Sequence, residues 1–200
     1  MNPASHGDAA AARRRDAAVA GHTGDVPAAR RLAADPDARV AATALGALAR
    51  AGALDTDTLA TALDDPRPAV RRRAAELAAS HPGGTLLPLL AADDDTVVEV
   101  AAFAIGERRP REPGAVDALA AVARHHHDAL CREAAVAALG SLGEHAGLPH
   151  VLAALDDKAT VRRRAVIALA AFDGPEVEAA LDRARGDRDR QVRQAAEDLL

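Results

Sequence analysis

A pattern of about 30 residues recurs six times along the chain. In each clear copy an acidic turn is followed five residues later by a valine, then by an arginine. The clear copies are DDPRPAVRRRAAELA, DDKATVRRRAVIALA and GDRDRQVRQAAEDLL, at residues 64–78, 156–170 and 186–200, and weaker copies start near residues 35, 93 and 126. Internal repeats with periods of about 20–50 residues are the signature of solenoids and related arrays, so this pattern restricts the fold more than any other feature.

Each copy supplies one small apolar anchor, which we expect to be buried. The anchors are Val40, Val70, Val97, Cys131, Val161 and Val192, at intervals of 30, 27, 34, 30 and 31 residues. The turn aspartates aligned with them are Asp35, Asp65, Asp156 and Asp187. After Val161, apolar or small residues follow at Ala165, Ala168 and Leu169, a spacing typical of one buried helix face. The anchor therefore marks the longer helix of each repeat.

Capping residues and breakers predict where the helices begin and end. The pairs Asp35-Pro36 and Asp65-Pro66 combine an N-capping side chain with a proline suited to the first helical turn, so we expect longer helices to start there. Glycine and proline then end each longer helix and open a shorter one. The predicted shorter helices span about residues 54–63, 85–91, 115–124, 148–155 and 176–185.

The composition supports an all-α fold. Alanine dominates the apolar residues, and Phe103 and Phe172 are the only aromatic side chains, which favours closely packed helices over strands. A single helix pair cannot bury its own apolar face, so neighbouring pairs must stack. We therefore predict an α-solenoid, a superhelical stack of antiparallel helix pairs with about six repeats. Residues 25–200 form one domain in this prediction, and residues 1–24 form a capping helix or a partly ordered tail.

The acidic turn, the VRRxA pattern and the following ALG or its variants resemble the HEAT-like repeats named after phycobilisome lyases. The resemblance covers about residues 25–200 and is poorest in the fourth unit, where histidines replace the turn aspartates. It implies stacked helix pairs whose longer helices line the concave face. Similar repeats occur in bilin lyase subunits, in accessory domains of enzymes, in DNA glycosylases and in adaptor proteins, so the resemblance does not fix a function.

Two sets of arginines follow the anchors and call for different interpretations. The first set, Arg71, Arg132, Arg162 and Arg193, keeps a fixed offset from the turn and predicts a ladder of structural hydrogen bonds between units. The next positions, Arg72, Arg73, Arg163 and Arg164, lie off the buried face and are candidates for partner contact, or else ordinary solvated side chains. The segment GERRPREPG, at residues 106–114, lengthens the third interval to 34 residues. It is either an ordinary insertion or a proline-stiffened recognition loop, in which case Arg108, Arg109 and Arg111 are further contact candidates.

His125, His126 and His127 form a weak candidate metal site. They occupy a turn whose neighbours carry Asp93–Asp95 and Asp156-Asp157, and mixed histidine and aspartate ligands suit zinc or a similar ion. Consecutive histidines diverge, however, so an exposed polar turn is the preferred interpretation. Cys131 stands where the other repeats have a buried valine, which indicates a core residue rather than a nucleophile.

The charge and the motifs give little support for catalysis. The net charge of -5 does not favour anionic partners for the chain as a whole, and there is no Trp or Tyr for base stacking, so nucleic acid is not the expected partner. We expect no cofactor, no membrane association and, from the single cysteine, a cytoplasmic location.

The predicted function is a non-catalytic scaffold or adaptor that binds another protein or a peptide segment. The alternatives are a bilin lyase or isomerase component, which would need a tetrapyrrole, and a phosphate- or nucleic-acid-binding module that uses the arginine clusters.

Overall fold

The computed structural model describes residues 3–81 and 83–199, with side chains from residue 8 onward, and its regular elements in these ranges are all helices. Residues 1, 2, 82 and 200, which fall within the predicted segments 1–24 and 25–200, lie outside the described residues. The chain divides into two compact units, Met1–Thr85 and Leu86–Leu200. The division predicted from the sequence, at residue 24, stays a prediction.

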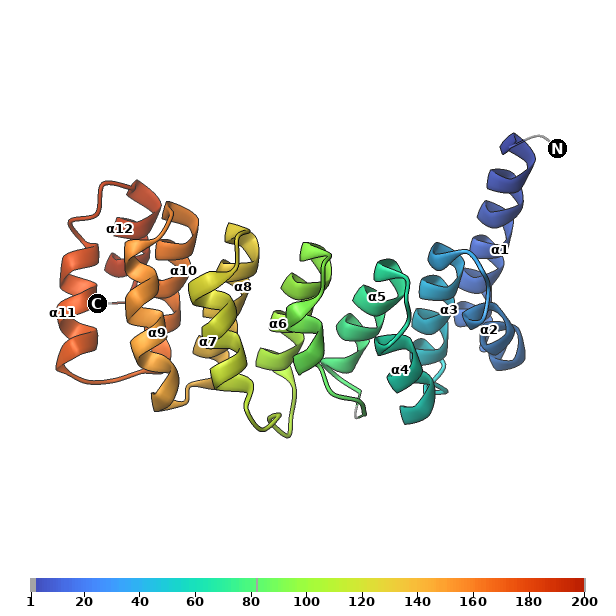
Figure 1. Ribbon diagram of the computed structural model, residues 1–200, viewed down its shortest axis with the longest axis horizontal. Coiled ribbons are helices and arrows are strands. Elements are labelled where there is room, and N and C mark those ends of the chain that lie inside the picture. The colour runs from blue at the N-terminus through green and yellow to red at the C-terminus, as the bar shows by residue number, and fades with distance from the viewer. Residues whose placement is uncertain (1–2, 82, 200) are drawn as a thin grey trace. The chain divides into compact units, whose positions relative to one another are not determined.

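The first unit contains three longer helices and two shorter ones. Its helices are α1 (Pro3–Thr23), α2 (Val26–Ala33), α3 (Ala38–Arg50), α4 (Thr56–Leu63) and α5 (Pro68–Ala78). The longer helices α1, α3 and α5 pack in one row, while α2 packs on α3 and α4 on α5 (Figure 1). Each shorter helix therefore forms a pair with the longer helix that follows it.

The second unit repeats this arrangement. Its elements are the 3₁₀ helix η1 (Leu87–Ala91), α6 (Asp95–Glu107), α7 (Ala115–His125), α8 (Ala129–Leu142), η2 (His145–Gly147), α9 (Leu148–Ala153), η3 (Ala154–Asp156), α10 (Ala159–Ala168), η4 (Leu169–Ala171), α11 (Pro175–Ala184) and α12 (Arg190–Glu197). Helices α6, α8, α10 and α12 form the row of longer helices, and α7, α9 and α11 lie beside them (Figure 1). The prediction of an all-α solenoid built from antiparallel helix pairs is confirmed.

In each unit the core consists of alanine, valine and leucine side chains between the longer and the shorter helices. All six anchors, from Val40 to Val192, are buried. Alanines on the same faces are buried with them, for example Ala44, Ala74 and Ala165. Small side chains let the longer helices approach closely, which explains why alanine dominates the composition.

Glycine allows the closest approaches between neighbouring longer helices. A Cβ added to Gly106 would lie 2.9 Å from the Ala138 Cα, and one added to Gly140 would lie 2.8 Å from the Ala168 Cβ. Gly106 and Gly140 both lie nine residues after their anchors, and their alanine neighbours both lie seven residues after theirs. Gly21 of α1 meets Ala47 of α3 in the same way, at 2.9 Å. Helix α1 thus packs in the register of a repeat helix.

The predicted helix starts at Asp35 and Asp65 are wrong. Helix α3 starts at Ala38 with Asp37 as its N-cap, and α5 starts at Pro68. The Asp35 carboxylate instead accepts the backbone N–H of Asp37 at 2.9 Å and holds the turn before the helix. Two further differences concern shorter helices: the segment near residue 85 forms a 3₁₀ helix, and α2, capped by Asp25, was not among the predicted helices.

Candidate functional site

A ladder of arginines and aspartates runs along the turns of the second unit. Arg132 of α8 donates from Nε and Nη2 to the Asp157 carboxylate at 2.6 and 2.8 Å. Arg162 of α10 donates to the Asp187 carboxylate at 2.9 and 2.8 Å, and its Nη1 also binds the Asp157 carbonyl oxygen at 2.8 Å. Arg193 binds the Asp187 carbonyl oxygen at 2.7 Å. Each arginine thus holds its own turn, and Arg132 and Arg162 also reach the next turn.

The turn aspartate in this ladder is Asp157, not the aligned Asp156. Asp156 ends η3 and is exposed, whereas the Asp157 side chain takes both bonds from Arg132. Hydrogen bonds from Arg132 and Arg162 lower the pKa values of Asp157 and Asp187, and they raise the pKa values of the two arginines. These residues are therefore committed to structure and are not free to bind a partner.

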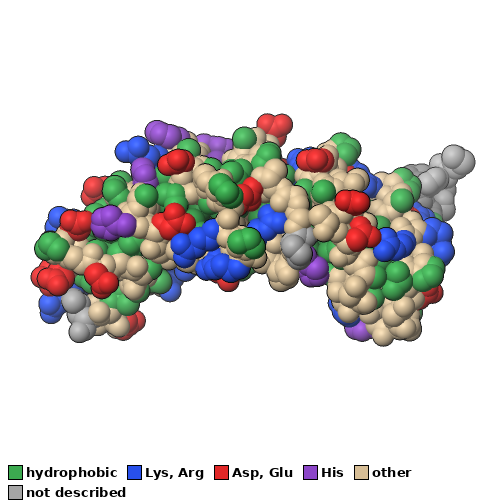
Figure 2. Space-filling model, turned by 90° about the horizontal axis from the view of Figure 1, so that it is seen from below, with side chains coloured by type: hydrophobic (Ala, Val, Ile, Leu, Met, Phe, Trp, Pro, Cys, Tyr) green, Lys and Arg blue, Asp and Glu red, His purple; other side chains and the backbone are tan. Residues whose placement is uncertain are grey.

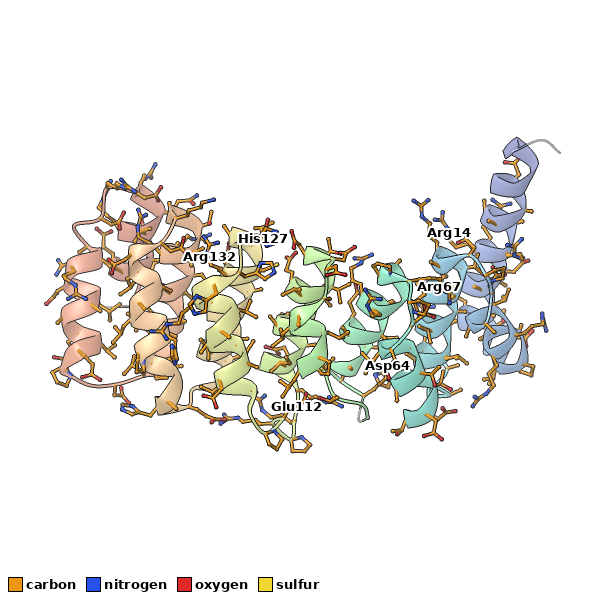
Figure 3. All side chains as sticks on the ribbon, viewed as in Figure 1. Arg14, Asp64, Arg67, Glu112, His127 and Arg132 are labelled. Carbon is orange, nitrogen blue, oxygen red and sulfur yellow. The ribbon has the colours of Figure 1, made fainter. Side chains whose placement is uncertain are left out.

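The first unit contains the same ladder with a different arginine at one position. Arg13 of α1 donates to the Asp35 carboxylate at 2.7 Å, as Arg132 does to Asp157. Helix α3 has Ala41 where α5, α8, α10 and α12 carry arginine. Arg67 of the next turn binds the Asp35 carbonyl oxygen at 2.7 Å in its place (Figure 3). Arg67 also pairs with Asp65, and Arg71 binds the Asp65 carbonyl oxygen at 2.8 Å.

His126 replaces an aspartate where no arginine needs one. Helix α6 carries the buried Val98 at the ladder position, so the following turn has no guanidinium to bind. The His126 Nδ1 accepts the backbone N–H of Asp128 at 3.2 Å, the same bond that Asp187 accepts from Asp189. The ring therefore keeps the turn hydrogen bond without the carboxylate.

The histidine turn brings His126, and not all three histidines, to a candidate metal site. Donor atoms of Asp95, His126 and Cys131 lie within 4.8 Å of one another. The Cys131 thiol is buried and lies near Asp128 and Asp95, which raises its pKa to about 12 and disfavours the thiolate that a metal requires. Because the His126 Nδ1 accepts an N–H, its Nε2 carries the proton in the neutral ring and offers no lone pair. These residues fit a hydrogen-bonded turn better than a metal site.

His127 lies beside this cluster, whereas His125 lies apart from it. His127 is exposed and its Nε2 lies 3.3 Å from the Asp95 carboxylate (Figure 3). His125 ends α7 and lines a separate groove with Arg132 and His150. His126 and His127 therefore both lie close to Asp95, and only His125 is placed elsewhere among the three histidines.

The four contact candidates on the longer helices are partly paired. Arg72 and Arg73 both pair with Glu76, at 3.4 and 2.7 Å, and Arg164 pairs with Glu133 at 3.2 Å. Arg163 is exposed and makes no ion pair within residues 8–81 and 83–199. All four side chains lie off the buried strip, and their role in binding stays a prediction.

The loop between α6 and α7 does not display its arginines equally. The Arg108 side chain is only 11% exposed, because it lies against Glu112, which also accepts the Leu86 N–H. Arg109 donates to the carbonyl oxygens of Gly106 and Arg108, and the more exposed Arg111 pairs with Glu144 at 3.2 Å. Figure 2 shows basic side chains gathered on this edge of the second unit. Arg108 thus stabilises the loop through Glu112, whereas the side chains of Arg109 and Arg111 are exposed to solvent.

A basic groove crosses the longer helices of the first unit. It has a volume of about 480 Å³ and is lined by residues of α1, α3 and α5. The charged or titratable residues described among its lining are five arginines and one histidine, namely Arg14, His22, Arg39, Arg50, Arg72 and Arg73. The groove thus lies on the face of the longer helices, which the resemblance to HEAT-like repeats predicts to be the concave face.

The corresponding face of the second unit has a different chemistry. Phe103 of α6 is 58% exposed and Ile167 of α10 is 38% exposed, and both lie six residues after their anchors. Ile167 and Arg163 line a groove of about 230 Å³ between α10 and α12. The acidic Glu99 and Glu133 stand at positions equivalent to Arg72.

Sequence reasoning missed Arg14, Arg39 and Arg50. Arg14 belongs to a third arginine triplet, Arg13–Arg15, within AARRRDAAVA, which aligns with VRRRAAELA in the register shown by the Gly21 contact. That match could have identified α1 as a repeat helix. Arg39 and Arg50 lie outside the triplets, so only the packing of α3 between its neighbours shows that they share one groove.

Comparisons with known proteins agree with this architecture. Residues 84–170 match the family model for HEAT repeats. A designed armadillo repeat protein superposes with a TM-score of 0.61 at 20% identity, covering 88% of this chain and 98% of that one. Another, in complex with the peptide (KR)4, gives a TM-score of 0.64 at 18% identity, with coverages of 87% and 97%. An engineered protein gives 0.60 at 19% identity, with coverages of 88% and 95%.

No curated protein matches the sequence. At these identities the structural neighbours establish the fold alone, and the phycobilisome-lyase type of repeat stays a prediction. Among the described residues, no helix has both the length and the apolar character needed to cross a bilayer.

Proposed function

Because this chain is a HEAT-like repeat protein, we propose that it works as a non-catalytic scaffold or adaptor that holds a segment of another protein across its longer helices. The exposed Phe103 is the observation that carries this proposal. It is one of only two Phe, Trp or Tyr residues in the chain, and its side chain is exposed to solvent on the longer helix α6. Aromatic residues, phenylalanine among them, are enriched in the cores of protein–protein interfaces relative to the rest of the surface.

The surrounding surface supports the same interpretation. The position of Phe103 in its repeat corresponds to Gly46 and Ile167, which line the grooves of the first and second unit. Small residues on this face, such as Ala42 and Ala137, let the backbone of an extended segment approach the helices. A designed neighbour of this fold is in complex with the peptide (KR)4, which supports a peptide segment as the kind of partner that we propose.

The single cysteine bears on the compartment in which we propose that the protein works. A scaffold with a single buried thiol needs no oxidising compartment for its stability, so we place it in the cytoplasm. On the longer helices of the second unit, Arg163, Phe103 and Ile167 are the contact residues that we propose, because all three side chains are exposed there.

Selection of a random displayed peptide library on the full chain tests the proposal. We expect a family of related peptides to be enriched and to bind in solution. For peptides that bind the second unit, Phe103→Asp should weaken binding about tenfold or more, because it places a charge where an apolar contact forms. Ala121→Asp is the matched control, since it adds the same charge to an exposed position of α7.

Circular dichroism checks that both variants keep their helical content. Failure to enrich any peptide that binds in solution would contradict the proposed function. Equal losses of binding in the two variants would contradict the assignment of the longer-helix face.

A further inference from the structure

We propose that the groove over α1, α3 and α5 binds an acidic segment of a partner protein, with its arginines pairing with aspartate and glutamate carboxylates. This inference rests on the proposed function and names the partner chemistry for the first unit. Its basis is the groove lining, in which five arginines from three helices converge without an acidic residue among the described lining residues. The chain as a whole is acidic, with a net charge of -5, so this concentration of positive charge is local.

Three of these arginines are available for a ligand. Within residues 8–81 and 83–199, the side chains of Arg14, Arg39 and Arg50 make no ion pair, in contrast to the ladder arginines Arg13 and Arg67. All three are exposed. Figure 3 shows Arg14 on α1, next to α3. Unpaired arginines that face one groove repel one another, and an anionic ligand removes this repulsion.

Two glycines shape the groove. A Cβ at Gly21 would lie 2.7 Å from the Arg50 Nη1, and a Cβ at Gly46 would collide with the Arg73 guanidinium. Both guanidinium groups therefore lie across the surface of the neighbouring helix. The positive charges are in this way spread over α1 and α3, where they can meet successive side chains of an extended segment.

Glu76 reduces the charge of the groove only at one edge. It pairs with Arg72 and Arg73, but both arginines are partly exposed, and ion pairs in solvent contribute little. A carboxylate on the ligand can bind either guanidinium in a bidentate manner and displace Glu76. A partner with several acidic residues thus gains contacts across the whole groove.

The observations favour an acidic protein segment over nucleic acid. Grooves that bind single-stranded nucleic acid without reading its sequence combine positive charge with aromatic platforms for base stacking. The described lining of this groove contains no Phe, and the chain has neither Trp nor Tyr. The arginine fork matches a carboxylate without such stacking.

Fluorescence anisotropy with the full chain and three labelled probes tests this inference: octaglutamate, octalysine and oligo(dT). We expect octaglutamate to bind more tightly than oligo(dT), and octalysine not to bind at this groove. The double variant Arg14→Glu/Arg39→Glu should raise the octaglutamate Kd about tenfold or more. Arg188→Glu/Arg190→Glu is the matched control, because it makes the same charge change at two exposed positions of the second unit and should alter the Kd less than about twofold.

A neutral pair, Arg14→Gln/Arg39→Gln, repeats the test without introduced repulsion and should also weaken binding. Tighter binding of oligo(dT) would overturn the acidic-segment inference in favour of nucleic acid, and equal losses in groove and control variants would overturn the site. Failure of this inference is distinct from failure of the proposed function. Displayed peptides that are not acidic and do not respond to the groove variants would leave the scaffold role standing, whereas the absence of any selected peptide would contradict that role.

Discussion

Arg162 binds the Asp187 carboxylate through two hydrogen bonds of 2.9 and 2.8 Å, although the arginine side chain is only 7% exposed. The same guanidinium binds the Asp157 carbonyl oxygen, so one side chain joins two successive turns. Arg132 and Asp157 repeat this geometry one unit earlier. The ladder therefore fixes the spacing of neighbouring helix pairs through polar contacts, beside the alanine-rich core.

Breaking the Arg162 pair should destabilise the second unit. Asp187→Ala leaves a buried guanidinium without its carboxylate, and we expect the free energy of unfolding to fall by about 3 kcal/mol. Urea denaturation followed by far-UV circular dichroism measures the change. The control is Asp182→Ala, since Asp182 and Arg185 form an exposed pair at 3.6 Å whose loss should cost less than about 1 kcal/mol. Similar losses for the two variants would show that the ladder contributes no more than a surface pair.

Acid should weaken the fold through the same aspartates. Hydrogen bonds from arginine lower the pKa values of Asp35, Asp65, Asp157 and Asp187. The folded state therefore binds these protons more weakly than the unfolded state does. The stability they contribute is present above the unfolded pKa of about 4 and is lost as the pH falls below it.

Thermal unfolding between neutral pH and about pH 3 measures this effect. The Tm should stay nearly constant down to about pH 5 and then decrease. Asp187→Asn removes one of the linked protons, so its Tm should start lower and change less with pH. A variant curve parallel to that of the native chain would contradict the assignment of Asp187 as a linked group.

The repeat spacing predicted the row of longer helices because each anchor is a local signal that tertiary contacts reinforce. The buried Val97 and Val161 stand where the alignment placed them. The choice between capping residues was not readable in the same way. Both Asp35 and Asp37 can cap a helix, and Arg13, from the preceding repeat, decides that Asp35 binds a guanidinium while Asp37 caps α3.

The candidate site was harder to predict than the fold. The triplets indicated Arg72 and Arg73, but the groove also needs Arg39 and Arg50, which only helix packing brings together. Arg108 shows the opposite error. The loop sequence suggested an exposed side chain, and the contact with Glu112 buries most of it. For the groove the missing information was the packing of three helices, and for Arg108 it was the folded shape of its own loop.

Added volume at the glycine contacts should also destabilise the helix stack. In Gly106→Ala the new Cβ meets the Ala138 Cα at 2.9 Å, and a backbone atom cannot move aside as a flexible side chain can. Overpacking costs about 1–3 kcal/mol, of which the better helix propensity of alanine offsets at most about 1 kcal/mol. We expect a net loss in urea denaturation. Gly186→Ala, whose nearest atom would lie 3.5 Å away, is the control and should be close to neutral.

The thiol of Cys131 should react slowly in the folded protein. Burial first, and then the charges of Asp128, Asp95 and Glu99, raise its pKa to about 12, so the thiolate fraction near pH 8 is on the order of a thousandfold below that of a free cysteine. Absorbance of the released thiol from a disulfide reagent measures the rate. We expect at least a hundredfold acceleration in urea, because unfolding exposes the thiol and restores its ordinary pKa. Cys131 is the only cysteine in the chain, so the signal has one source, and Cys131→Ala supplies the blank. Rapid reaction of the native protein would contradict the core assignment and revive Cys131 as a reactive residue.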